Sequence, residues 1–271
     1  MSVENYISLY ADNSSELIEL MQNLYPSIPN EAISEKSFFN GRIKASVHAW
    51  DNRTIQWMKE DYGVSVNHCL SFQYFSSSDC NSANELLYVM KQLVRMLNCD
   101  LLYKPNGDSP VMVRRSGILL FDDYFYRYFG EGASDSLREQ NQIKITDDMS
   151  MEDIMKCCEE KFGDDFNWWM LPEEKREVPF VPELKLELGE DDPFFDGLVY
   201  AIYKCDANDD MLFQSVRNDG TALWRIYHLT YAHRRERVGF PIRLDFESGQ
   251  KAAEYIINQY VEDNESCGIK L

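Results

Sequence analysis

Residues 81–97 read NSANELLYVMKQLVRML, which is the strongest helical pattern in the chain. Its apolar side chains recur at spacings of three and four, which is typical of a helix packed on one side. These residues are Leu86, Leu87, Met90, Leu93, Val94 and Leu97. Asn81 or Ser82 can cap the first turn. A strand is predicted before the helix at 64–75. Three short strands are predicted after it, at 100–103, 111–114 and 117–121.

The elements on the N-terminal side of this helix also alternate between strands and helices. The residue pattern predicts a helix at 54–62, a strand at 42–50, a helix at 14–24 and a first strand at 6–10. Every second residue from Ile43 onward in the strand at 42–50 is apolar, as expected for a strand buried on one face. Helices inserted between antiparallel strands predict an α+β fold, in which a mostly antiparallel sheet carries helices on one face.

The last quarter of the chain predicts a second α/β-sandwich-like unit of the same kind. A helix is predicted at 249–260. Four strands are predicted before it, at 198–204, 211–216, 223–231 and 240–246. The polar stretch 130–150 separates the two sheets, so we predict three parts. They are an N-terminal α+β domain at 1–130, an acidic connector with a short helix at 131–196, and a C-terminal antiparallel sheet plus terminal helix at 197–271.

Acidic residues dominate the composition. The 271 residues include 27 Lys and Arg against 46 Asp and Glu, a net charge of −19. This charge disfavours binding to nucleic acid or to an anionic membrane, because both need an excess of basic side chains. Residues 131–196 carry 7 basic and 20 acidic side chains, whereas 1–130 and 197–271 have net charges of only −4 and −2. The excess of negative charge is therefore concentrated in residues 131–196. The expected partner of this segment is a basic protein.

The cysteines and the hydrophobic pattern bear on the compartment. The seven cysteines are odd in number and scattered, which is typical of reduced thiols in a cytosolic protein. The first residues show no basic region followed by an apolar run, and no stretch of about 18 apolar residues occurs. We therefore expect a cytoplasmic protein without a secretory signal or a membrane-spanning helix.

Sequence motifs for catalysis or cofactor binding are missing. The chain has no phosphate-binding glycine loop, dinucleotide-binding turn, serine-hydrolase elbow or zinc-protease motif, so we expect no enzyme, no cofactor and no metal. Asp206, Asn208 and Asp210 have the spacing that begins a calcium loop, but the later glycine and glutamate are missing, which favours a hairpin turn. His228 is a conceivable acid–base residue on a strand, although a hydrogen-bonded structural histidine is favoured.

Aromatic residues flank the acidic connector and suggest a protein-binding surface. Buried aromatic side chains anchor interfaces, and carboxylates steer a basic partner toward them. The candidate partner-binding residues are Trp168, Trp169, Glu183, Glu187, Glu190, Asp191, Asp192, Phe194 and Phe195. In the alternative interpretation, the aromatic residues fix the segment to the core. Arg234, Arg235 and Arg237 form either a solvated loop end or a contact for carboxylates.

Residues 35–129 carry a recognisable order of elements. A strand at 41–50, a helix at 54–61 and a strand at 66–74 precede the amphipathic helix. The stretch ends with Asp100-Leu101-Leu102, Gly107-Asp108 and Arg115-Ser116-Gly117-Ile118-Leu119. In this order it resembles the immunity proteins of the swarming-inhibition (Sit) toxin systems, a family of bacterial contact-dependent polymorphic-toxin competition. The resemblance spans about a third of the chain and brings no catalytic motif. It implies a cytoplasmic protein that binds a cognate toxin and keeps it inactive.

The predicted function is therefore that of an immunity protein that blocks the active site or assembly of one toxin. A nuclease toxin has a basic substrate groove, which an acidic segment with aromatic anchors would fit. Two alternatives remain open. One is an enzyme that uses His228 in a C-terminal pocket, and the other is a non-catalytic adaptor or structural protein.

Overall fold

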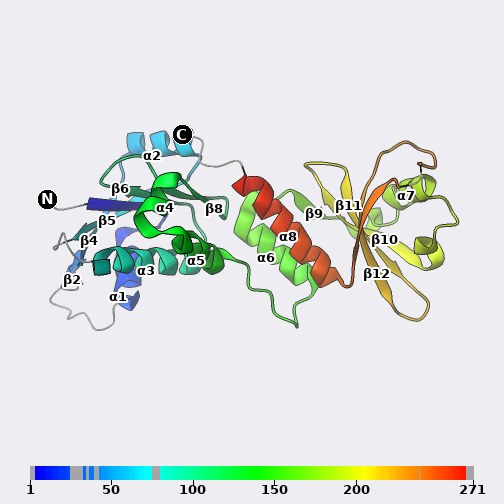
Figure 1. Ribbon diagram of the computed structural model, residues 1–271, viewed down its shortest axis with the longest axis horizontal. Helices are drawn as coiled ribbons and strands as arrows, with labels where there is room; N and C mark the ends of the chain where they lie inside the picture. The colour runs from blue at the N-terminus through cyan, green and yellow to red at the C-terminus, as the bar shows by residue number, and fades with distance from the viewer. Residues whose placement is uncertain are drawn as a thin grey trace. The chain divides into compact units, whose positions relative to one another are not determined.

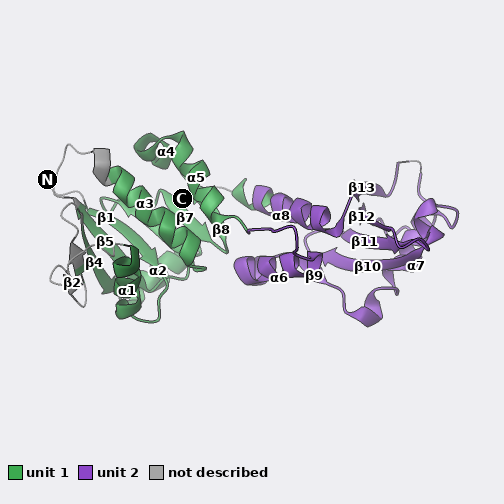
Figure 2. Cartoon of the chain, turned by 90° about the horizontal axis from the view of Figure 1, so that it is seen from below, with its two compact units in different colours: residues 1–143, 263–271 green, residues 144–262 purple. Residues whose placement is uncertain are grey.

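The computed structural model describes residues 4–24, 33–34, 37–39, 43–74, 80–237 and 239–266. The chain divides into two compact units, coloured separately in Figure 2. Unit 1 comprises residues 1–143 and 263–271, and unit 2 comprises residues 144–262. Each contains one sheet, and all strand pairs between described residues are antiparallel. The predicted α+β class with two mostly antiparallel sheets is confirmed.

Unit 1 contains an eight-stranded sheet with the order β2-β3-β4-β5-β1-β6-β7-β8. Its strands are β1 (Glu4–Leu9), β2 (Ile33–Ser34), β3 (Ser37–Phe39), β4 (Ile43–Ala49), β5 (His68–Tyr74), β6 (Leu101–Pro105), β7 (Met112–Arg115) and β8 (Ile118–Phe121). Its helices are α1 (Ser14–Leu24), α2 (Asn52–Tyr62), α3 (Cys80–Met96), α4 (Asp123–Phe129) and α5 (Glu131–Asn141). Figure 1 shows α1, α3 and α5 in unit 1. The ends that we predicted for two strands at Gly41, Arg42 and Phe75 lie outside the described residues.

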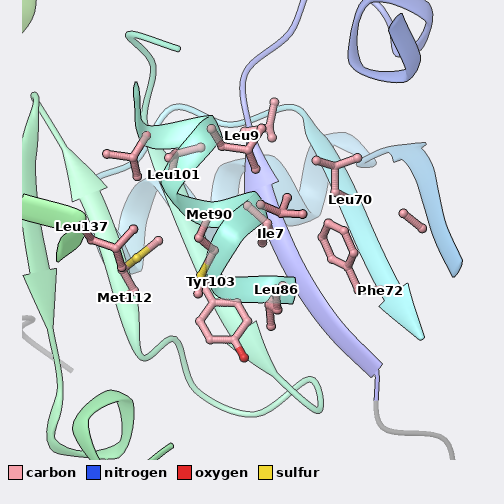
Figure 3. Close-up of a cluster of buried hydrophobic side chains, with 14 of the residues drawn as sticks. Ile7, Leu9, Leu70, Phe72, Leu86, Met90, Leu101, Tyr103, Met112 and Leu137 are labelled. Carbon is pink, nitrogen blue, oxygen red and sulfur yellow. The ribbon is translucent and has the colours of Figure 1, made fainter. Parts of the chain in front are cut away.

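Helix α3 packs on the sheet through the periodic residues that the sequence singled out. Leu86, Met90 and Leu93 are at most 1% exposed and share one core with residues of β1, β5 and β6. Figure 3 shows Leu86 and Met90 among the strand residues Ile7 and Tyr103. Apolar residues repeat every 3.6 residues in the helix and at every second residue in the strands, so each element has one apolar face, and these faces pack together.

Helix α2 covers the opposite face of this sheet, where we had expected helices on one face. Met58 of α2 lies in a second cluster with Leu102 and Val113, whereas the neighbouring Leu101 belongs to the α3 core. Asp51 caps α2 by accepting a hydrogen bond from Thr54 N at 2.8 Å. Gly63 ends α2 with a φ of +67°, a conformation that glycine adopts without strain.

The residues that carry the family resemblance at 100–117 have structural roles. Asp100 accepts one hydrogen bond from Ser65 N at 2.7 Å and another from Ser116 N at 3.1 Å. Ser116 and Gly117 both have positive φ and form the tight turn between β7 and β8. This carboxylate thus fixes a hairpin to a distant loop.

Unit 2 contains a five-stranded sheet with the order β13-β12-β11-β10-β9. Its strands are β9 (Trp168–Met170), β10 (Leu198–Cys205), β11 (Asp210–Val216), β12 (Ala222–His228) and β13 (Ile242–Phe246). Its helices are α6 (Met151–Phe162), α7 (Phe180–Leu188) and α8 (Gly249–Glu265), with short 3-10 helices at Gly163–Asp165, Glu173–Lys175 and Pro193–Asp196. Helices α6 and α8 pack on one face, and α7 packs on the other.

The predicted acidic connector at 131–196 does not exist as a separate part. Residues 131–141 form α5, which buries Ala133 and Leu137 in the core of unit 1. Residues 144–196 belong to unit 2, to which they contribute α6, α7 and the edge strand β9. The short helix predicted within this stretch is present as α6. Strand β9 and helix α7 are short and expose charged residues, so their few buried positions give a weak hydrophobic signal.

Candidate functional site

Two of the predicted aromatic anchors are core residues of unit 2. Phe194 is 0% exposed and packs against Tyr227 in an edge-to-face arrangement, with ring centroids 5.6 Å apart. Trp168 is 7% exposed and packs among residues of α6 and α8. An anchor residue must be accessible to the partner, so these two buried side chains cannot be anchors of the predicted interface. They fix their segment to the core, as the alternative interpretation proposed.

Glu183 and Glu187 are also buried, at 7% and 1% exposure, and both bind the loop after β12. The Glu187 carboxylate accepts hydrogen bonds from Thr230 N at 3.0 and 3.1 Å. Glu183 accepts one from His233 N at 3.0 Å, and its second oxygen lies 2.6 Å from His233 Nδ1. We call this set of contacts the carboxylate clamp. It holds residues 229–237 against α7 and removes two charges from the predicted partner surface.

Burial and hydrogen bonding act in opposite directions on Glu183. Burial disfavours its charged form, but the hydrogen bonds and charge of His233 outweigh this and lower the pKa of the carboxyl. The clamp therefore contains an ionised Glu183 at neutral pH. Arg235, from the cluster for which a solvated loop end and a carboxylate contact were both open, lies 3.2 Å from Asp191 in an exposed pair. This contact belongs to the same loop and helix end.

The remaining residues around Phe194 have mixed roles. Asp192 caps the 3-10 helix at 193–196 by accepting a hydrogen bond from Phe194 N at 2.9 Å. Phe195 is partly buried beside Phe194, with ring centroids 6.0 Å apart. Glu190 is exposed. The predicted set therefore does not form one binding surface.

Trp169, like Phe195, is a predicted anchor that remains partly accessible. It lies on the edge strand β9, and its indole Nε1 donates a hydrogen bond to Asp206 at 2.7 Å. The next residue, Met170, is 36% exposed. Glu173 and Glu174 follow on an exposed 3-10 turn. We call Trp169, Met170, Glu173, Glu174 and Asp206 the β9 edge surface. It combines an aromatic and a methionine side chain with three carboxylates.

The sequence indicated only part of this surface, namely Trp169. Asp206 drew attention only as part of a calcium-like spacing, and it reaches Trp169 because β9 pairs with the end of β10, where Cys205 lies opposite Trp168. The signal that existed was the adjacent Trp169-Met170 pair before an acidic run. Strand pairing across more than thirty residues is needed to bring the hairpin carboxylate beside the indole.

The loop at Asp206–Asp210 is a hairpin turn between β10 and β11, as predicted. Asn208 accepts a hydrogen bond from Asp210 N at 2.8 Å and donates one to the Asp210 carboxylate at 2.9 Å. These contacts satisfy the polar groups within the turn. Throughout the part of the chain that the structure describes, no group of three His, Cys, Asp or Glu side chains is placed to hold a metal ion.

His228 is a hydrogen-bonded strand histidine, as favoured from the sequence. Its Nδ1 lies 2.8 Å from the Asp210 carboxylate on the neighbouring strand β11. A carboxylate in this position fixes the imidazole orientation and can support acid–base chemistry. Among the described residues, no serine, threonine or cysteine hydrogen bonds to the ring, and Cys205 on β10 is buried with a raised pKa.

Comparison with known proteins provides no relative for this arrangement. The chain matches no protein-family model, no curated protein and no solved structure. Within the described residues, no helix is long and apolar enough to cross a membrane.

Proposed function

We propose that this protein is an immunity-type binding protein that recognises a cognate toxin with a basic surface and holds it inactive. The observation that carries the proposal is the β9 edge surface, where the partly exposed Trp169 lies beside the Asp206 carboxylate. The exposed Met170, Glu173 and Glu174 follow it along the chain. Aromatic and methionine side chains supply interface area, and the carboxylates around them select a basic partner.

The charge of unit 2 supports the same function. Residues 144–262 carry 14 basic and 26 acidic side chains. Part of this charge is used internally, because Glu183 and Glu187 bind the loop at 229–237. Glu173, Glu174 and Glu177 remain exposed beside β9. A field of this sign accelerates association with a basic groove such as that of a nuclease, and the rate falls as salt screens it.

The test is co-expression of the protein with the product of the neighbouring open reading frame, followed by growth and affinity measurements. We expect the protein to restore growth and to form a complex. Trp169→Ala should weaken the complex by at least about tenfold, as for an anchor residue. Trp57→Ala is the matched control, because Trp57 is 37% exposed but lies in unit 1.

Three results would count against the proposal. Absence of both growth rescue and a complex contradicts the function itself. Equal effects of Trp169→Ala and Trp57→Ala contradict the chosen surface. Loss of neutralisation in a folded His228→Asn variant, with the complex intact, would instead favour the enzyme alternative.

A further inference from the structure

Strand β13 is an open edge of the unit 2 sheet. It stands at the end of the strand order, and among the described residues it pairs with β12 alone. Figure 2 shows it at the margin of the sheet, beyond β12. An edge strand presents a row of unpaired N–H and C=O groups, which another strand can complete. Proteins usually protect such edges with bulges, proline or inward-facing charges.

The side chains on one face of β13 are apolar and only partly covered. Ile242 is 53% exposed and Leu244 is 38% exposed. Phe246, the third residue of this face, packs against Tyr255 of α8 with ring centroids 5.4 Å apart. The strand therefore has an apolar stripe that continues from the core of unit 2 to the sheet edge.

The side chains on the other face of β13 are charged and of opposite sign. Asp245 forms an ion pair with Arg225 on β12 and lies 3.3 Å from Arg243 on its own strand. Asp245 and Arg243 are 54% and 48% exposed, so each can take a further partner. The strand itself is neutral, in contrast to the rest of the acidic chain.

The order Ile242-Arg243-Leu244-Asp245-Phe246 is complementary to itself when reversed. If two such strands run antiparallel about Leu244, then Leu244 faces Leu244 of the second strand and Arg243 faces Asp245. Ile242 faces Phe246 on the apolar side. Opposite charges and apolar pairs placed directly across a ladder each stabilise antiparallel pairing. We propose that β13 binds β13 of a second copy of this chain, forming a symmetric dimer with one continuous sheet.

A second copy fits this edge better than an unrelated strand. In the second copy, β13 has the same apolar and charged residues, and a two-fold axis through Leu244 places each of them opposite its complement. A strand from a basic toxin would place like charge opposite Arg243. One strand of five residues forms a small contact compared with stable interfaces of roughly 1,200–2,000 Å². The dimer is therefore expected to dissociate on dilution.

Analytical ultracentrifugation of the full chain tests the association directly. Across a series of rising concentrations in moderate salt, the mass should increase from 31.7 kDa toward twice that value. Leu244→Lys should keep the protein at 31.7 kDa, because two ammonium groups would then face each other. Leu198→Lys is the matched control, since Leu198 is 65% exposed on β10 of the same sheet, and it should dimerise normally.

Disulfide cross-linking tests the register. In the proposed pair the two Leu244 Cα atoms lie about 4.5–5.5 Å apart, within reach of a disulfide. The two Ile242 residues are separated along the strands by roughly 14 Å, which is beyond it. Under mild oxidation Leu244→Cys should therefore form covalent dimers above the background of the seven native cysteines, and Ile242→Cys should not.

The proposal is overturned if the wild type stays monomeric at every concentration. It is also overturned if a dimer forms but tolerates Leu244→Lys, or if both cysteine variants cross-link equally. A monomeric wild type whose complex with a toxin is lost on Leu244→Lys would assign the edge to the toxin instead.

Discussion

Nη1 of Arg114 donates a hydrogen bond to the carbonyl oxygen of Val94 at 2.8 Å, in the last turns of α3. The same guanidinium donates to Leu97 O at 2.6 Å and, through Nε, to Cys99 O at 2.8 Å. Arg114 is only 2% exposed. One buried cation on β7 therefore satisfies carbonyl groups that the end of a helix leaves without donors.

Arg114→Met should destabilise unit 1 by about 2–4 kcal/mol, because it leaves buried carbonyl groups without hydrogen-bond donors. The measurement is urea-induced unfolding followed by circular dichroism, with hydrogen exchange at the end of α3. Arg115→Met, at a half-buried neighbouring position, should cost less than about 1 kcal/mol. Similar losses in the two variants would show that the capping contacts contribute little.

The carboxylate clamp should control protease access to the loop at 229–237. Glu187→Ala removes the acceptor for Thr230 N, so the loop should open more often. Cleavage by trypsin after Arg234, Arg235 or Arg237 should then accelerate on the order of tenfold, which corresponds to about 1.4 kcal/mol. Glu190→Ala is the control, since Glu190 is exposed and outside the clamp. Unchanged cleavage in Glu187→Ala would mean that other contacts hold the loop.

Acid should weaken the same clamp. The pKa of Glu183 is lower in the folded protein than in the unfolded chain, so its contribution to stability is fully present above the ordinary glutamate pKa. It is lost as the pH falls through the lowered folded value. Thermal unfolding of the wild type and of Glu183→Gln should therefore differ most near pH 7 and converge as the pH falls through the lowered folded pKa of Glu183. A difference in Tm that is constant over this range would contradict an ionised Glu183.

Charge reversal beside β9 should slow binding to the toxin. Glu173→Lys with Glu174→Lys removes two exposed carboxylates that follow β9 in the chain, so the association rate should fall about tenfold or more at low salt. The salt dependence of the rate should also become shallower. The control is Glu60→Lys with Asp61→Lys, which makes the same charge change at exposed positions of α2 in unit 1. Equal slowing by both pairs would indicate net charge and not this surface.

The strongly periodic elements were predictable, and the short ones were not. The spacing of Leu86, Met90 and Leu93 predicts α3, and all three are buried. The turn at Ser116-Gly117 likewise marks the β7–β8 hairpin. Strand β9 has three residues and α7 nine, so neither offers enough repeats to be distinguished from a linker. The prediction of an acidic connector with one short helix at 131–196 followed from that weak signal.

The candidate site shows a different limit. Four acidic residues of the predicted site are close together in the sequence, and nothing in it distinguishes the buried ones from the exposed ones. They are Glu183, Glu187, Glu190 and Asp191. Which of them are buried depends on backbone donors at Thr230 and His233, which lie 43 and 50 residues further along the chain. The same holds for Asp206 beside Trp169.

The α+β class, the main helices of the first sheet and the concentration of negative charge follow from local periodicity and composition, so they could be predicted from the chain alone. The tertiary structure was needed to show that residues 144–196 join the second sheet, which carboxylates face solvent and which strands stand at the sheet edges. These properties depend on contacts between segments that are distant in the chain, and the local sequence of one segment does not identify the segment that it contacts.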